Sequence, residues 1–175
     1  MNPATATLVR DARIGDLPAI LEIHNRAIAE TTAIWDDEPV DLADRQAWFD
    51  NRTAHGRPIV VAEIDGELAG YASYGPWRPK SGYRHTAENS IYIADHFQRR
   101  GIGAALLAEL IERARAGGDI HAMIAVIESR NTASIALHER FGFRTVGELP
   151  EVGRKFGRWM DLTLMQLTLE MSVTS

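Results

Sequence analysis

The chain has 175 residues, a mass of 19.4 kDa and a formal net charge of −5. This length fits one domain, so we expect a single domain over residues 1–175 with its core at about residues 8–169. With 45% hydrophobic and 25% charged residues, no cysteine and an acidic balance, the composition argues against disorder, disulfides, thiolate chemistry and general nucleic-acid binding.

The first half of the chain predicts two helices followed by a β-hairpin. Asp16 is a suitable N-cap for an amphipathic helix, and Asp65-Gly66 is a typical hairpin turn. The expected elements, in chain order, are a strand at 8–10, helices at 17–29 and 41–54 separated by a loop, and strands at 58–64 and 67–74.

The second half alternates strands and helices. After a loop at residues 75–86, the expected elements are a short strand at 89–94, a helix between Gly103 and Gly117, a strand at 121–128, a helix from 131 to about 140, and strands at 143–149 and 159–169 with a loop between them. Hairpin-connected strands with interspersed helices predict a mixed α/β sheet.

A glycine-containing turn between the strand at 89–94 and the next helix is the first motif with chemical meaning. It reads Gln98-Arg99-Arg100-Gly101-Ile102-Gly103. Two glycines allow a close backbone approach, and a helix N-terminus offers free N–H groups to a pyrophosphate. A plain turn with solvated arginines is the alternative. Ala104 follows where a P-loop needs lysine, and Leu106 stands where a dinucleotide motif needs a small residue.

A second motif lies about 30 residues further on and reads Asn131-Thr-Ala-Ser134-Ile-Ala-Leu-His138-Glu-Arg-Phe-Gly142-Phe143. Together the two motifs resemble the GNAT N-acetyltransferase superfamily, and the resemblance extends over about residues 8–169. Within it the chain is similar to the phosphinothricin and methionine sulfoximine acetyltransferase branch. That closer likeness rests on the segments Gly75-Pro-Trp-Arg78, Thr86-Ala-Glu-Asn-Ser-Ile-Tyr-Ile93 and Val152-Gly-Arg-Lys-Phe-Gly-Arg-Trp159.

The resemblance implies the fold, the reaction and the cofactor-binding residues. The expected fold is a mixed, mostly antiparallel sheet flanked by helices, in which splayed central strands bind acetyl-CoA. The expected reaction is direct acetyl transfer from acetyl-CoA to an amine. The implied cofactor-binding residues are Ile91, Tyr92, Ile93, Gln98, Arg99, Arg100, Gly101, Ile102, Gly103, Ala104, Asn131, Ser134 and His138. Members of the family are commonly dimeric, so we expect a homodimer.

Removal of a proton from the acceptor amine requires a base, since such amines have pKa values near 9 or 10. Glu88 occupies the acidic position of the subfamily and is the expected base, directly or through one water. It could instead be a salt-bridged carboxylate that orients Arg84 or Arg78. His85 is a competing base, although a histidine in a loop is often simply exposed.

His138 stands where many superfamily members carry a tyrosine that is assigned as the proton donor to the departing thiolate. This departure leaves two interpretations open. His138 could donate a proton or hydrogen bond to the sulfur, or it could only pack against the cofactor. Asn131 and Ser134 also have ordinary alternatives, as a helix N-cap and a small helical residue.

The acceptor site is expected around the loop at residues 77–85. Arginines can hold a carboxylate or phosphinate through two hydrogen bonds, and aromatic side chains can wall a small pocket. Packing or solvation is the alternative for each of them, and the segment around Lys155 could come from the same or a neighbouring chain. The expected acceptor-binding residues are Trp35, Trp77, Arg78, Tyr83, Arg84, Glu88, Tyr92 and Lys155.

The sequence therefore predicts a cytoplasmic acetyl-CoA-dependent N-acetyltransferase for a small amino-acid-like amine of the methionine sulfoximine, methionine sulfone or phosphinothricin type. The alternatives are a peptide or protein N-acetyltransferase and a catalytically silent acyl-CoA-binding module. The six histidines show no metal-ligand spacing, so no metal is expected. No apolar run approaches the length of a membrane span, so no membrane partner is expected, and no nucleic-acid partner either.

Overall fold

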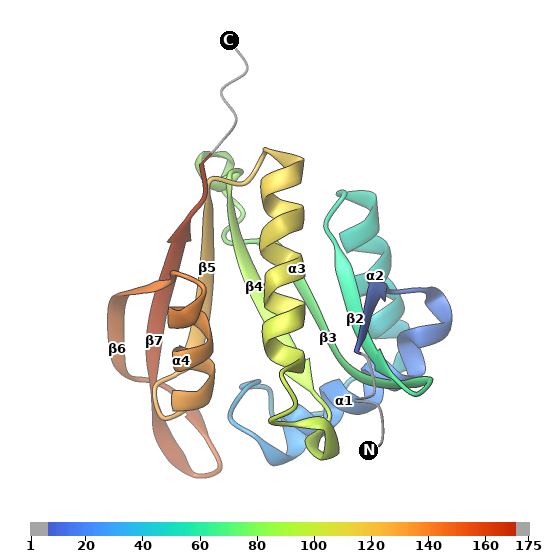
Figure 1. Cartoon of the computed structure of the whole chain (residues 1–175). Helices are drawn as coiled ribbons and strands as arrows, with labels where there is room; N and C mark the ends of the chain where they lie inside the picture. Colours follow the sequence, from blue (N-terminus) through green and yellow to red (C-terminus); the bar gives the residue numbers. More distant parts are fainter. Residues whose placement is uncertain (1–6, 171–175) are drawn as a thin grey trace, which may run out of the picture.

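A computed structural model describes residues 7–170 as a seven-stranded sheet with helices on both faces (Figure 1). The strand order is β1-β2-β3-β4-β5-β7-β6, and every neighbouring pair is antiparallel except β4 with β5. The expected mixed, mostly antiparallel fold is confirmed. The strands are β1 (Leu8–Asp11), β2 (Ile59–Ile64), β3 (Glu67–Pro76), β4 (Thr86–Ile93), β5 (Ala122–Glu128), β6 (Arg144–Lys155) and β7 (Arg158–Thr168).

The helices divide between the two faces of the sheet. One face carries α1 (Leu17–Glu30) and α2 (Leu42–Ala54), and the other carries α3 (Ile102–Gly117) and α4 (Thr132–Arg140). Alternate strand residues feed the two cores: Val61 and Tyr71 pack under α1, whereas Val60, Ala62 and Ala72 pack under α3. The longest buried stripe belongs to α3, which presents Leu106, Leu107, Leu110 and Ile111 to the sheet.

The two central strands separate part-way along their length. β4 pairs with β5 only from Thr86 to Glu88, opposite Ala122 to Ile124. Beyond that point β5 continues with β7 while β4 continues with β3, and the two strands diverge in Figure 1. The β5 side of residues 89–93 in β4 therefore has no strand partner, and its backbone groups are open to a ligand.

β4 begins earlier than expected, which changes the setting of Glu88. The sequence predicted a loop up to residue 86 and a strand from 89, because Thr86, Glu88 and Asn89 interrupt the apolar pattern. In the structure Glu88 lies inside the strand, paired with Gly75 of β3 and Ile124 of β5. Its backbone is therefore held from both sides, as a precisely oriented base requires.

β6 is longer than the sequence predicted. The expected strand stopped at 149 because Pro150, Glu151 and two glycines follow. The strand nevertheless runs to Lys155, with register shifts between Thr145 and Gly147 and between Leu149 and Gly153. As the last strand of the sheet it has a free edge, where proline and bulges are tolerated. The connection to β7 is only Phe156-Gly157, both with positive φ, as in a tight hairpin.

Asp16 does not cap α1 as the sequence suggested. Its side chain makes no capping hydrogen bond; the carboxylate accepts instead from the backbone N–H of Arg13 at 2.7 Å and from the Arg10 guanidinium. A turn of 3-10 helix at Ile14–Asp16 precedes the α-helix and accounts for the change. The contact ties β1 to the start of α1.

Candidate active site

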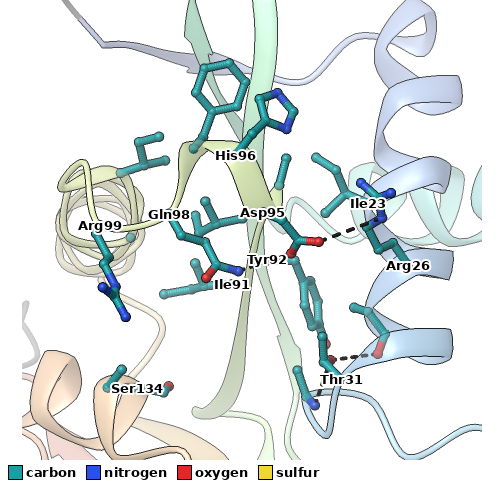
Figure 2. A pocket seen from close by; sticks show the side chains of 18 of the residues that line it. Ile23, Arg26, Thr31, Ile91, Tyr92, Asp95, His96, Gln98, Arg99 and Ser134 are labelled. Carbon is teal, nitrogen blue, oxygen red and sulfur yellow. Dashed lines mark hydrogen bonds and ion pairs between the residues drawn. The ribbon is translucent and has the colours of Figure 1, made fainter.

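Two cavities meet at β4, where the sheet opens. The larger has a volume of about 650 Å³ and extends from α1 across β4 to the N-termini of α3 and α4 (Figure 2). The smaller, of about 380 Å³, lies between β4, β5 and the segment that follows α1. The cavities share Ala33, Ile91, Tyr92, Asn131 and Ser134 in their walls, so a ligand in one reaches the other.

The N-terminus of α3 has uncapped backbone N–H groups that can bind an anion. Gly101 adopts φ +81° at the N-cap position, and no side chain caps the helix. The first intrahelical hydrogen bond in this turn is donated by Ala105 to the Gly101 carbonyl. The N–H groups of Ile102, Gly103 and Ala104 precede it and point toward the cavity end of the helix, where a pyrophosphate can accept from them.

Most of the predicted cofactor-binding residues come together in the larger cavity. In Figure 2, Arg99 and Ser134 approach from one side and Thr31 from the other, with Ile91 and Tyr92 between them. Arg100 is an exception, because its guanidinium stacks over the Phe97 ring, 5.3 Å from the centroid, and does not line the cavity. The predicted residues in the wall are Ile91, Tyr92, Ile93, Gln98, Arg99, Gly101, Ile102, Gly103, Ala104, Asn131 and Ser134.

Glu88 lies in the wall of the smaller cavity, on the same face of the sheet as Tyr92. Burial raises the pKa of its carboxyl, while attraction to the Arg52 and Arg78 guanidinium groups lowers it, and the net direction is upward. A carboxylate with a raised pKa is a stronger base than an exposed one. Glu88 forms no salt bridge with Arg78 or Arg84 within residues 7–170, although the Arg78 charge still acts on its carboxyl.

His138 lines the smaller cavity and is held on both ring nitrogens. Nδ1 lies 2.8 Å from the Ser134 carbonyl oxygen, and Nε2 lies 3.1 Å from the Asn89 side-chain oxygen Oδ1. A carbonyl only accepts, so Nδ1 carries a proton, and burial lowers the pKa of His138, which favours the neutral ring. Nε2 is then an acceptor, and Asn89 must turn its NH2 group toward it. This rotation also gives an acceptor to a buried Nδ2 that otherwise has none.

The remaining wall of the smaller cavity is largely apolar, with one buried carboxylate. Ile34 and Trp35 contribute from the segment after α1, Tyr92 from β4 and Leu162 from β7. Burial and the nearby Glu88 charge raise the pKa of Tyr92 to about 12, so its phenol stays protonated. Glu128 is 5% exposed; its carboxylate accepts from the Arg130 backbone N–H at 3.2 Å and from the Thr32 hydroxyl at 3.4 Å.

Several predicted acceptor residues lie outside both cavity walls, in two groups. Trp77, Arg78, Tyr83 and Arg84 belong to the connection between β3 and β4, where Arg78 stacks on Trp77 and Arg84 donates to the Ser81 carbonyl at 3.3 Å. Arg78 is near enough to affect the Glu88 charge. Lys155 is buried, and its ammonium donates to the carbonyls of Ile28 and Ile34. It therefore shapes the cavity through the segment that carries Trp35.

His85 is tied to a different part of the molecule. Its Nδ1 donates to the Asp119 carbonyl oxygen at 2.7 Å, and its own carbonyl accepts from His121 and Ala122. The ring lines neither cavity. This position, beside the start of β5, makes Glu88 the better-placed of the two predicted bases.

Sequence reasoning missed three polar residues of the site. The sequence places Asn89 in a short strand, Glu128 at the end of an apolar strand and Arg52 in the helix at residues 41–54, with no functional role for any of them. An Asn directly after the predicted base, and a Glu closing an apolar strand, are signals that could have drawn attention to the first two. Arg52 carries no local signal, because its place beside Glu88 depends on how α2 packs against the sheet.

Within residues 7–170, no group of three or more His, Asp or Glu side chains is arranged to hold a metal ion. The same stretch contains no helix that is long and apolar enough to cross a membrane.

An open strand edge beside an uncapped helix N-terminus suits the two ends of an acylated pantetheine pyrophosphate, whose amides can pair with β4 and whose phosphates can accept from α3. A carboxylate stands at the adjoining cavity. This combination defines an acyl-CoA-dependent transferase, the class to which the fold and the site point.

The comparisons with known proteins agree with that class. The sequence model described as "Acetyltransferase (GNAT) family" matches residues 20–143. A Pseudomonas aeruginosa L-methionine sulfoximine/L-methionine sulfone acetyltransferase is 58% identical, over 93% of this chain and 94% of its own length. A phosphinothricin N-acetyltransferase from Alcaligenes faecalis is 42% identical, over 97% and 86%. A Salmonella typhimurium acetyltransferase structure with acetyl-CoA superposes with a TM-score of 0.93 at 46% identity, covering 97% of each chain.

The chain belongs to the GNAT acetyltransferase family. It is an acetyl-CoA-dependent N-acetyltransferase, and the predicted family, fold and enzyme class are confirmed.

Proposed function

We propose that this enzyme acetylates the amine of a small amino-acid-like acceptor, with methionine sulfoximine, methionine sulfone and phosphinothricin as the leading candidates. The observation that carries the proposal is the smaller cavity. Its volume of about 380 Å³ suits one small molecule, Glu88 lies in its wall, and it adjoins the cofactor cleft at Ile91 and Tyr92. The named activities of relatives that match almost the whole chain support the same acceptors.

The proposed reaction is a direct transfer between two bound substrates. The acceptor ammonium loses a proton to Glu88, directly or through one water, and the free amine attacks the thioester carbonyl. The new C–N bond forms, the C–S bond breaks, the nitrogen loses its second proton to give the amide, and coenzyme A leaves as a thiolate that takes up one proton. Holding both reactants at the junction of the cavities supplies much of the rate gain.

His138 serves this reaction by positioning Asn89. With Nδ1 donating to Ser134 and Nε2 accepting from Asn89, the neutral ring has no proton available for the thiolate. The amide oxygen of Asn89 then faces away from the ring. We therefore prefer the packing interpretation of His138 over the proton-donor interpretation. The thiolate then takes its proton from solvent or receives the second proton that the nitrogen loses.

A peptide acceptor is the second candidate, and the walls of the smaller cavity disfavour it. Ile34, Trp35 and Leu162 give it an apolar wall, and Lys155 and Gly153 of the β6–β7 hairpin hold Trp35 in place. A peptide needs an open groove on both sides of the reacting amine. A silent acyl-CoA-binding module would have no use for a buried carboxylate at the end of the cleft.

A homodimer is also part of the proposal, and the β6–β7 hairpin supports it. Among residues 7–170, nine large apolar side chains are exposed and five of them lie here, namely Val146, Leu149, Val152, Phe156 and Trp159. A concentration of exposed apolar surface of this kind is typical of an interface. Sedimentation of the purified protein at two concentrations tests the state, and a monomer at both would contradict it.

The proposed chemistry uses no metal, since a thioester is already activated toward an amine and Glu88 supplies the base. No membrane or nucleic-acid partner takes part in it. The cytoplasmic location stays a prediction from the sequence.

The function is tested by measuring thiol release from acetyl-CoA with methionine sulfoximine, methionine sulfone, phosphinothricin, ordinary amino acids and one basic peptide. The protein has no cysteine, so it contributes no thiol background. Release with the small acceptors and none with the peptide is the expected result. Release with the peptide alone would contradict the proposed acceptor class, and silence with every acceptor, together with tight acetyl-CoA binding, would favour the binding-module alternative.

A further inference from the structure

We propose that Arg52 is a positioning residue for catalysis: its guanidinium, seated on Gly75 beside Glu88, is the fixed positive charge that keeps the base ionised. The inference rests on the proposed role of Glu88 as the base. No motif of the sequence points to Arg52, which lies near the C-terminal end of α2.

The Arg52 guanidinium lies over Gly75 of β3, where the lack of a side chain leaves room for it. Gly75 is the direct cross-strand partner of Glu88, so the two residues face the same side of the sheet. The Arg52 guanidinium occupies the space above Gly75, and a methyl group at this position would overlap three of its atoms. A glycine in a buried strand normally weakens the strand, so this one marks a close approach.

The guanidinium has few partners of its own. Within residues 7–170 its Nε is buried without a hydrogen-bond partner, and no carboxylate lies within 4.0 Å of its nitrogen atoms. Burial lowers the pKa of Arg52, and the charge of Glu88 is the main influence that raises it. An arginine remains charged in such a place. Because no other carboxylate neutralises this charge at close range, it acts mainly on Glu88.

Two charged groups act on the Glu88 carboxylate from the surrounding elements, and Tyr92 and Arg45 lie further along the same network. Arg52 of α2 and Arg78 of the β3–β4 connection attract it, and Arg52 is the stronger influence. Tyr92 lies four residues from Glu88 on the same face of β4. The Glu88 charge helps to raise the pKa of its phenol, which stays neutral, and Arg45 of α2 lowers that pKa. Burial is the largest influence on Glu88 and raises its pKa, and Arg52 partly offsets it; without Arg52 the pKa would rise further, and Glu88 would hold its proton to higher pH.

The test is Arg52→Gln, with kcat/KM measured from pH 5.5 to 9 using methionine sulfoximine as the acceptor. We expect the acidic limb of the profile to move to higher pH by about one unit, at the lower end for a nearby opposite charge. At a pH below the limb this shift is about a tenfold loss, with little loss on the plateau. Arg57→Gln is the matched control, because Arg57 follows the same helix but pairs with Asp119.

A second variant moves the charge without removing it. Gly75→Ala fills the seat and displaces the guanidinium, so the same shift of the limb is expected although every ionisable group remains. It also keeps the proposal testable if Arg52→Gln does not fold. An unmoved limb in both variants would overturn the proposal, as would a raised acceptor KM at every pH, which is the result expected if Arg52 bound the acceptor carboxylate.

Titration of Glu88 by carbon NMR separates this proposal from the proposed function. Glutamate side-chain carboxyls are labelled, and the signal of Glu88 is identified by its loss in Glu88→Gln. Without any substrate, Arg52→Gln should move the Glu88 titration upward by the same amount as the acidic limb. If the wild-type enzyme acetylates none of the acceptors, the function fails while this measurement still decides the role of Arg52.

Discussion

Glu88 is held between opposing influences at the scale of a single residue. Its strand position removes it from water, and two guanidinium groups partly restore the stability of its charge. Neither influence alone produces a useful base, because an exposed carboxylate is too weak and an isolated buried one stays protonated. The side chain lines the smaller cavity, on the same face of β4 as Tyr92, which lies in the walls of both cavities.

Replacement of Glu88 by Gln keeps the shape of the side chain and removes the base. We expect kcat to fall by about 10²–10⁴, the usual contribution of a positioned base. The dissociation constant of acetyl-CoA should change little, because Glu88 does not line the larger cavity. Thiol release gives the first quantity and calorimetric titration the second. Unchanged turnover would remove Glu88 as the base.

The sequence predicts residues of the site well where the signal is local. The Gly101–Ala104 turn is predicted because strand, glycine and helix start are neighbours in the chain, whereas Glu88 is predicted from the resemblance of residues 86–93 to the acetyltransferase branch. Arg100 does not fit because two arginines in a turn point in different directions, and its ring partner Phe97 is not foreseeable. Arg52 and Lys155 act on the site through contacts between distant elements, with Gly75 and with the carbonyls after α1.

At the scale of elements, α3 combines two tasks that its ends make possible. Its apolar stripe fixes it on the sheet, and its N-terminus stays uncapped at the cleft. Both ends are set by a glycine in the left-handed region, Gly101 with φ +81° and Gly118 with φ +68°. These two positions are alike in backbone strain and differ in their distance from the cofactor site, which makes them a matched pair.

Gly101→Ala should cost about 1–2 kcal/mol of stability, the penalty for an L side chain in the left-handed region. It should also raise the dissociation constant of acetyl-CoA several-fold, because the strained turn presents the N–H groups of α3 less well. Gly118→Ala should lower stability by a similar amount with no effect on acetyl-CoA. Urea unfolding and calorimetric titration measure both, and equal affinity losses in the two variants would contradict the pyrophosphate site at this turn.

The order of the elements was largely predictable, whereas the extent of the edge strands was not. Glycine turns at Asp65-Gly66 and Gly117-Gly118 end elements through backbone geometry that any context preserves. β6 depends on pairing with β7, which overrides the unfavourable Pro150 and the glycines within it. A strand of this kind is decided by its partner and carries little signal in its own residues.

At the scale of the whole molecule, the α1 face hides a polar group beneath the acceptor cavity. His24 is buried, with Nδ1 2.8 Å from the Tyr71 hydroxyl, and its ring lies edge-on to Tyr92. Arg45 approaches the same nitrogen at 3.5 Å. Burial and the Arg45 charge lower the pKa of His24 to about 4, so the ring is neutral in the folded protein at neutral pH.

The protein should lose stability on acidification through this histidine. The folded-state pKa is below the unfolded value, so the contribution is complete above about pH 6.5 and declines as the pH falls toward about 4. The size is on the order of 3 kcal/mol. Urea unfolding between pH 4 and 7.5 measures the slope. His24→Gln, whose amide oxygen can still accept from Tyr71, should flatten it, and an unchanged slope would contradict the assignment.

The contact between Trp35 and the β6–β7 hairpin has a thermodynamic consequence. Trp35 packs on Gly153 so closely that no side chain fits there, and Lys155 binds the carbonyls on either side of the same segment. One wall of the acceptor cavity is therefore built on the hairpin that exposes most of the apolar surface. In the proposed homodimer, association through that hairpin would make acceptor binding and association linked equilibria. By reciprocity, the factor by which association raises the acceptor affinity equals the factor by which bound acceptor raises the association constant.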